Sequence, residues 1–120
     1  MKGIKANYLA RERRRRRIRK RIFGTTDRPR LAVYKSNRYI YAQLINDEEG
    51  RTLAFASSLK YKEGKVNAKS IEIARRLGED LGRQVKDMGI KQIVFDRSGY
   101  PYHGRIKALA EGVRQQGVKF

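Results

Sequence analysis

The spacing of apolar residues changes along this sequence, and that change constrains the fold more than any other feature. Between residues 31 and 57 apolar side chains alternate with polar ones, as in half-buried β-strands, whereas from 71 to 88 they recur every three or four residues, as in an amphipathic helix. The short apolar segment "QIVFD" at 92–96 predicts a buried strand, and a second helical pattern covers 104–116. The predicted order of elements is βββαβα.

The first three strands are predicted as an antiparallel meander. They cover 31–35, 39–46 and 51–57, and the turn sequences "KSNR" and "NDEEG" join them. The second strand has two distinct faces, with Ile40, Ala42 and Leu44 on one and Tyr39, Tyr41 and Gln43 on the other. We expect the apolar face to lie against the core and the other face to stay open.

The two helices are predicted to cover the apolar face. Asn67 can cap the first helix and Gly89 can end it, while Gly78 and Gly82 favour a close approach to the sheet. The first apolar stripe comprises Ile71, Ala74, Leu77, Leu81, Val85 and Met88, and the second comprises Ile106, Leu109, Ala110 and Val113. Because a helix joins strands three and four, the fourth strand can run parallel to a neighbour. The predicted class is α/β (α+β), a single domain with a mixed four-stranded sheet and both helices on one face.

A basic arm is predicted before this domain. The chain of 120 residues has 30 Lys and Arg, 12 Asp and Glu and a net charge of +18, and eleven of the basic residues lie within residues 1–22. Between Leu9 and Ile18 only Ala10 is apolar, and like charges one turn apart oppose a helix. We predict an arm at 1–28, disordered in the free protein, and a folded domain at 29–120.

This charge excess predicts a polyanionic partner, either nucleic acid or an anionic membrane. The arm has no apolar face that could insert beneath lipid headgroups, and no stretch of about 18 apolar residues occurs, so we expect no membrane partner and a cytoplasmic protein. The absence of Cys and the single His exclude a disulfide framework and a typical zinc site. No cofactor is expected.

The open face of the sheet is the first candidate site. Aromatic rings can stack on unpaired bases, amides and hydroxyls can bind base edges and 2′-hydroxyls, and cations can bind phosphates. RNA suits these residues better than duplex DNA, because no basic helix is shaped for a major groove. The alternative is that alternating Tyr residues simply suit a half-exposed strand. The candidates are Arg30, Lys35, Ser36, Asn37, Arg38, Tyr39, Tyr41 and Gln43.

The second candidate is the segment "FDRSGYPYHGRIK" at 95–107, which turns at Gly99, Pro101 and Gly104 before a helix. Its RNA-binding candidates are Arg97, Tyr100, Tyr102, His103, Arg105 and Lys107. The alternative is that the segment mainly holds the last helix in place.

An enzyme is the competing interpretation of this segment, because Asp96, Ser98 and His103 are residue types of a hydrolytic triad or a nuclease. The sequence has no nucleophile elbow and no second carboxylate near Asp96, which disfavours catalysis. Instead, Asp96 is expected to anchor the turn or to pair with Arg97 or Arg105. His103 is expected to pack or to form a hydrogen bond within the loop.

Several segments together resemble a known family. "RPRLAVYKSNRYIYAQLI", "TLAFASS", "NAKSIEIARRLGEDL", "IVFDRSGYPYHGRIKALAEGVRQQG" and the terminal "VKF" follow an Arg-rich arm in this order. They are similar to bacterial ribosomal L18, a family of 5S rRNA-binding proteins of the large ribosomal subunit.

The resemblance implies a βββαβα core that binds 5S rRNA and, with neighbouring ribosomal proteins, helps attach it to the large-subunit rRNA in the central protuberance. It implies no catalytic activity and no cofactor, and we expect a monomer when the protein is free. It adds Ser57, Ser58 and Lys60 to the contacts on the open face. The arm is expected to anchor RNA electrostatically through Arg13, Arg14, Arg15, Arg16, Arg17, Arg19, Lys20 and Arg21.

Overall fold

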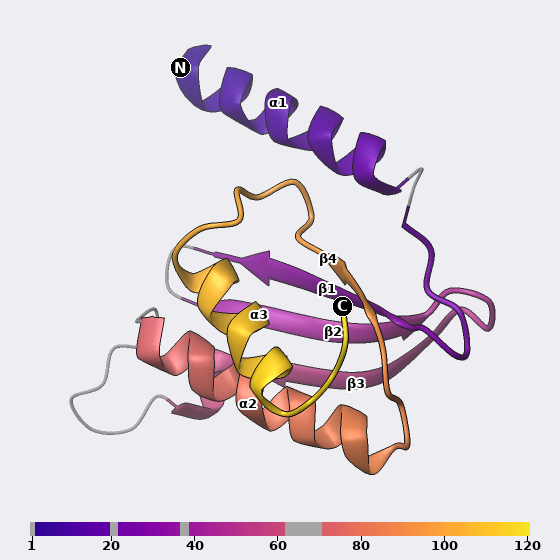
Figure 1. Ribbon diagram of the computed structural model, residues 1–120. Helices are drawn as coiled ribbons and strands as arrows, with labels where there is room; N and C mark the ends of the chain where they lie inside the picture. The colour runs from indigo at the N-terminus through magenta and orange to yellow at the C-terminus, as the bar shows by residue number, and fades with distance from the viewer. Residues whose placement is uncertain (1, 20–21, 37–38, 62–70) are drawn as a thin grey trace.

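The computed structural model describes residues 2–19, 22–36, 39–61 and 71–120. Figure 1 shows an N-terminal helix set apart from a sheet that carries two further helices. The elements in chain order are α1 (Lys2–Arg19), β1 (Arg30–Lys35), β2 (Ile40–Asn46), β3 (Arg51–Ser57), the 3-10 helix η1 (Ser58–Tyr61), α2 (Ile71–Asp87), β4 (Val94–Asp96) and α3 (Arg105–Gln115).

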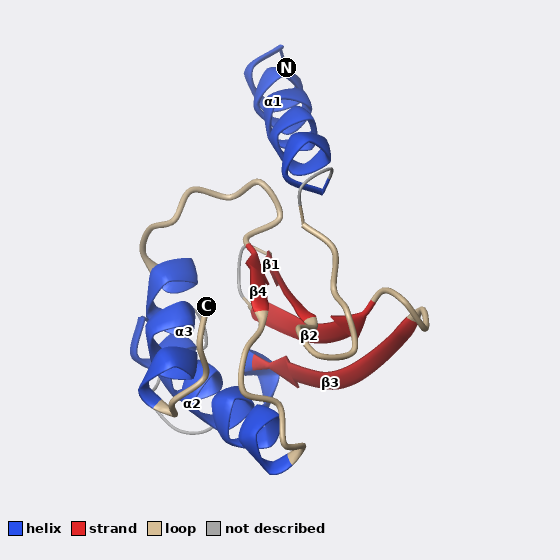
Figure 2. Ribbon diagram, turned by 45° about the vertical axis from the view of Figure 1, so that its right-hand side comes forward, coloured by secondary structure: helices blue, strands red, loops and turns tan. Residues whose placement is uncertain are grey.

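The sheet has the predicted mixed topology. Its strand order is β3-β2-β1-β4, in which β1 pairs antiparallel with β2 and parallel with β4, and β2 pairs antiparallel with β3. Figure 2 shows α2 and α3 together on one side of the sheet, and the segment from α1 to β1 on the other. The predicted single α/β domain is therefore confirmed.

The two faces of β2 are divided as predicted. Burial alternates along the strand, with Ile40, Ala42 and Leu44 fully buried and Tyr41 and Gln43 partly exposed. The buried side chains join the apolar residues of α2 and α3 in one core. Burial of this alternating stripe fixes the register, because a slip by one residue would turn the apolar side chains toward solvent.

The fourth strand is shorter than predicted. It begins at Val94, because the preceding residues pair with the C-terminus instead of with β1. Gln92 forms a parallel bridge with Lys119, and the backbone N–H of Ile93 donates to the Lys119 carbonyl at 3.0 Å.

The helical stripes are confirmed except at the ends of α2. All four predicted core residues of α3 are buried, as are the central residues of α2. Ile71 and Met88, however, are 53% and 44% exposed, and Ile73 is buried in their place. Both exposed residues lie at or just beyond an end of the helix, where the core does not cover them. The predicted cap, Asn67, lies outside the described residues.

The C-terminal end of α2 is the predicted glycine turn. Gly89 has φ +79°, its N–H donates to the Lys86 carbonyl, and the N–H of Ile90 donates to the Val85 carbonyl. This left-handed ending satisfies carbonyls that a helix end leaves free.

The glycines of α2 bring it close to α3, and the prediction that they approach the sheet was wrong. A Cβ at Gly78 would lie 2.1 Å from the Leu109 carbonyl oxygen, and one at Gly82 would lie 2.9 Å from the Gln116 side chain. Gly112 of α3 completes the contact, since a Cβ there would lie 2.4 Å from the Arg75 carbonyl oxygen. The two helices thus meet backbone to backbone over the sheet.

Residues 2–19 of the arm form the helix α1, and disorder of the arm in the free protein stays a prediction. Two interactions offset the like-charge repulsion. Glu12 and Arg15 form an ion pair at 2.6 Å one turn apart, and Arg14 bonds to the loop after β4. The division into arm and domain at residue 28 stays a prediction.

Gly78→Ala tests the helix contact. Alanine raises intrinsic helicity, but its Cβ would collide with the backbone of Leu109. We expect a net loss of about 2 kcal/mol in the free energy of unfolding, as overpacking causes, measured by urea denaturation. The exposed substitution Arg76→Ala on the same helix should change it by less than about 0.5 kcal/mol. A more stable Gly78→Ala protein would contradict the close contact.

Candidate nucleic-acid interface

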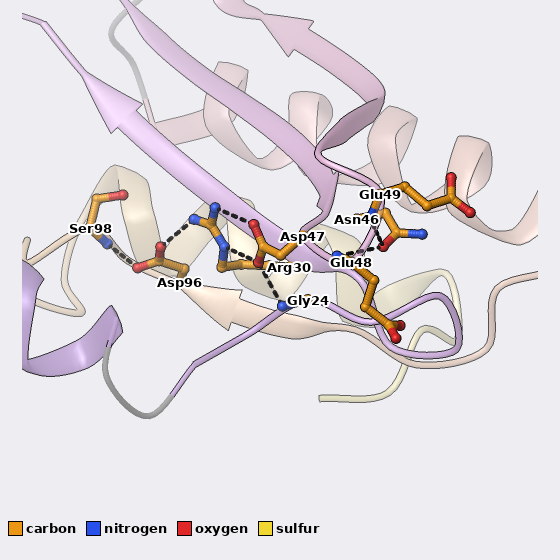
Figure 3. A network of polar contacts seen from close by, with 8 residues as sticks. All are labelled: Gly24, Arg30, Asn46, Asp47, Glu48, Glu49, Asp96 and Ser98. Atoms are coloured by element: carbon orange, nitrogen blue, oxygen red, sulfur yellow. Dashed lines mark hydrogen bonds and ion pairs between the residues drawn. The ribbon is translucent and has the colours of Figure 1, made fainter.

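Arg30 lies at the start of β1 and binds two carboxylates at once (Figure 3). Its Nε and Nη2 donate to Asp47 at 2.9 and 3.1 Å, and its Nη1 donates to Asp96 at 2.8 Å. Asp47 also accepts from the backbone N–H of Gly24. The hydrogen bond with Asp47, opposed by burial and aided by Asp96, raises the pKa of Arg30 above its ordinary value. Arg30 is 8% exposed, so its side chain is covered and is not open to a partner.

Asp96 anchors the turn after β4, as predicted, but pairs with Arg30 instead of Arg97 or Arg105. Its second oxygen accepts from the backbone N–H of Ser98 at 2.9 Å. The carboxylate is fully buried and both oxygens are engaged, whereas His103 is exposed. This arrangement gives Asp96 a structural role and argues against the competing interpretation of a catalytic triad.

The loop after Asp96 is a constrained turn. Ser98 is fully buried at φ +55°, and Gly99 and Gly104 have φ +81° and +58°. His103 donates its backbone N–H to the Pro101 carbonyl, so the expected bond within the loop involves its backbone and not its exposed ring. Gly104 precedes α3 without a side-chain cap.

Aromatic side chains gather on the open face. The register places Tyr34 of β1 opposite Tyr41 of β2, and Gln43 opposite Phe55 of β3. The Tyr41 ring lies 6.4 Å from that of Tyr39 and 6.5 Å from that of Phe55, centroid to centroid. Phe55 is 54% exposed, so this aromatic surface is open to a partner.

Two cations, Lys35 and Arg105, lie near the end of β1. Lys35 and Ser36 are exposed, and the Ser36 hydroxyl bonds to the backbone of Tyr39. Burial of part of its side chain and the positive charge of Arg105 lower the pKa of Lys35. The predicted residues Asn37 and Arg38 lie outside the described residues.

Two of the predicted hydroxyl contacts are engaged inside the fold. The Ser58 hydroxyl is fully buried and accepts the backbone N–H of Ile40 at 2.9 Å, while the Ser57 hydroxyl accepts that of Leu59. These serines connect the end of β3 to β2 and to η1. Nothing is described of the Lys60 side chain.

The basic side chains of α1 lie largely in solvent. Arg13, Arg14, Arg16 and Arg17 are exposed, and Arg15 is partly covered in its pair with Glu12. Lys20, Arg21 and the side chain of Arg19 lie outside the described part of the chain. The remaining predicted residues, Arg97, Tyr100, Tyr102, Arg105 and Lys107, are all at least partly exposed.

Three side chains were missed by the sequence analysis: Tyr34, Phe55 and Arg11. The first two follow from the strand alternation once the register with β2 is known, because each lies opposite a residue already assigned to the open face. Arg11 lies over the Tyr100 ring, with its Cζ 4.8 Å from the centroid. No sequence pattern indicates a contact between such distant residues.

The described ranges contain no group of three or more His, Asp or Glu side chains that could hold a metal ion. Within them, no helix combines the length and apolar character needed to cross a bilayer. The arrangement can bind a polyanion through exposed cations and aromatic rings.

Comparison with known proteins decides the family. A family model described as "Ribosomal L18 of archaea, bacteria, mitoch. and chloroplast" matches residues 5–120. The chain belongs to the ribosomal L18 family. It is 54% identical over 109 residues to the large ribosomal subunit protein uL18 of Caldicellulosiruptor saccharolyticus, covering 89% of this chain and 88% of that protein. Its identity to the Staphylococcus aureus uL18 is 51% over 104 residues, 87% of each chain.

Membership of the L18 family makes this chain a structural protein of the large ribosomal subunit. The predictions of a ribosomal location, of rRNA as partner and of a protein without enzymatic activity are thereby confirmed.

Arg30→Lys tests whether Arg30 is a structural residue. Lysine keeps the charge but cannot donate to both carboxylates from a planar fork. We expect a loss of roughly 2 kcal/mol in the free energy of unfolding, with RNA affinity unchanged at temperatures where the protein stays folded. Arg51→Lys, in an exposed pair with Glu49, should cost less than about 0.5 kcal/mol. A folded Arg30→Lys protein with much weaker RNA binding would instead make Arg30 a contact residue.

Proposed function

We propose that this L18-family protein binds 5S rRNA and helps attach it to the large-subunit rRNA in the central protuberance, beside neighbouring 5S-associated proteins. The observation that carries the proposal is the open face, where the rings of Tyr39, Tyr41 and Phe55 adjoin one another. The exposed Lys35 lies at the end of the neighbouring strand β1. An aromatic surface bordered by cations suits unpaired bases and their phosphates.

The folded domain supplies recognition in this proposal. Its strands hold the rings of the open face before RNA arrives, so little conformational freedom is lost on binding. Gln43, partly exposed opposite Phe55, adds an amide that can bind a base edge or a 2′-hydroxyl.

The arm supplies a second, less selective contribution. A helix that carries exposed Arg side chains at 13, 14, 16 and 17 can contact phosphates of any RNA. These contacts strengthen binding without reading sequence, and they suit the large-subunit rRNA as well as 5S rRNA.

Tyr41→Leu tests the open face. Leucine keeps much of the apolar volume but cannot stack, so we expect a loss of about 1–3 kcal/mol in the free energy of 5S rRNA binding if one base stacks there. Filter binding to 5S rRNA and to a control RNA of equal length measures both affinity and preference. The preference should fall together with the affinity.

The matched control is Phe120→Leu, because Phe120 is a half-buried aromatic residue that packs against Phe95, away from Tyr41. Its affinity for 5S rRNA should equal that of the unmodified protein. Equal binding by Tyr41→Leu and Phe120→Leu would exclude recognition by the open face.

Deletion of residues 1–22 tests the arm. Affinity should fall, and the slope of log affinity against log salt should become shallower by about 0.7–0.9 for each lost phosphate contact. The preference for 5S rRNA over the control RNA should largely remain, as measured at two salt concentrations. Loss of that preference with an unchanged salt slope would reverse the roles assigned to arm and domain.

A further inference from the structure

Tyr100 lies where the arm, the loop after β4 and the end of β1 meet. Its hydroxyl donates to the Lys35 carbonyl at 3.2 Å and faces the Lys35 N–H at 3.4 Å. The Arg11 guanidinium and the Lys35 ammonium lie 4.8 and 5.3 Å from the centroid of its ring. One aromatic ring thus gathers two cations that come from separate elements.

A third cation, Arg105, completes this cluster. Its Nη2 lies 3.5 Å from the Ser36 carbonyl, and its Nη1 is buried without a hydrogen-bond partner. In the part of the chain that the structure describes, neither Lys35 nor Arg105 pairs with a carboxylate. Their proximity is unfavourable, since Arg105 contributes to the lowered pKa of Lys35. A buried donor without an acceptor costs free energy that a bound anion would recover.

Arg11 reaches the cluster only because α1 is held against the loop. The Arg14 Nε donates to the Gly99 carbonyl at 3.0 Å. Gly99 has no side chain to keep the helix away, and a Cβ there would lie 2.7 Å from the Arg11 carbonyl oxygen. The docked position of α1 therefore depends on a specific contact, and charge alone does not explain it.

We propose that Arg11, Lys35 and Arg105 form a single binding site for one RNA backbone phosphate, shared between the arm and the domain. We call these three residues the phosphate clasp. The inference rests on the proposed function and deepens it, because the arm becomes part of the recognition surface. RNA is the favoured anion because Lys35 lies at the end of β1 opposite Ile40, and the next residue of β2 is Tyr41 on the open face. An RNA strand whose bases stack on the open face carries one phosphate for each nucleotide, so one of its phosphates can reach the end of β1.

A double-mutant cycle with Arg11→Gln and Lys35→Gln tests the clasp. Each single variant should lower 5S rRNA affinity roughly tenfold, since a charged hydrogen bond is lost. If both cations bind the same phosphate, the double variant should lose far less than the hundredfold product of the two single effects. If the two losses multiply, the cations bind separate phosphates and the clasp is wrong. The clasp is also wrong if the unmodified protein, both single variants and the double variant bind 5S rRNA with equal affinity.

A second pair of variants tests whether α1 is docked against the loop after β4. Arg14→Lys keeps the charge but cannot reproduce the Nε bond to Gly99, so affinity should fall by about as much as in Arg11→Gln. Arg76→Lys makes the same substitution at an exposed position of α2, outside the proposed interface, and should bind like the unmodified protein. Equal affinity of these two variants would contradict a docked arm. Circular dichroism confirms that each variant is folded.

The failures of the two proposals are distinguishable. If the unmodified protein binds 5S rRNA and a control RNA equally, the proposed function fails, whatever the cycle shows. If it prefers 5S rRNA while the losses in the cycle multiply, only the clasp fails.

Discussion

The guanidinium of Arg30 joins segments that are far apart in the sequence. Through Asp96 it fixes the loop after β4, and through Asp47 it fixes the β2–β3 turn and the backbone of Gly24. A buried charge of this kind is costly to desolvate, and here two carboxylates compensate it. The backbone N–H groups of Gly24 and Ser98 donate in turn to those carboxylates. These bonds tie down two segments that lead to candidate RNA contacts. The arm leads into Gly24, and the loop leads from Asp96 to Tyr100.

The order of the elements and the two faces of the sheet could be predicted, because both follow from local periodicity. Ile40, Ala42 and Leu44 alternate strictly, and burial of that stripe leaves only one choice for Tyr41 and Gln43. The ends of α2 were predicted less well. Periodicity cannot indicate where a partner surface stops, and so Ile71 and Met88 were wrongly placed in the core.

Contacts between residues far apart in the chain could not be predicted from the sequence. Arg30 and Asp96 are 66 positions apart, and nothing in either segment indicates that they pair. Arg30 therefore resembled a surface cation among many. The same holds for Arg14 and Gly99, which are 85 positions apart. The arm composition correctly indicated a polyanion partner, but a charge pattern does not specify where a basic helix will dock.

The residues suited to electrostatic attraction and those suited to base recognition lie on different elements, and Tyr100 lies between these elements. Exposed Arg side chains of α1 suit any polyanion, while the rings on β2 and β3 suit unpaired bases. Between them, the docked α1 brings Arg11 to the domain. An arm held in this way can add affinity at a defined phosphate, which a freely moving chain of the same charge would not do.

Hydroxyl-radical footprinting of side chains, with and without 5S rRNA, tests most directly whether the open face is the recognition surface. The oxidation of Tyr41 and Phe55 is compared with that of Met88, which is 44% exposed just after α2. We predict strong protection of both aromatic residues on 5S rRNA, weaker protection on a control RNA of equal length, and unchanged oxidation of Met88. Protection of Met88 while Tyr41 and Phe55 stay reactive would place the RNA on the helices and contradict the account.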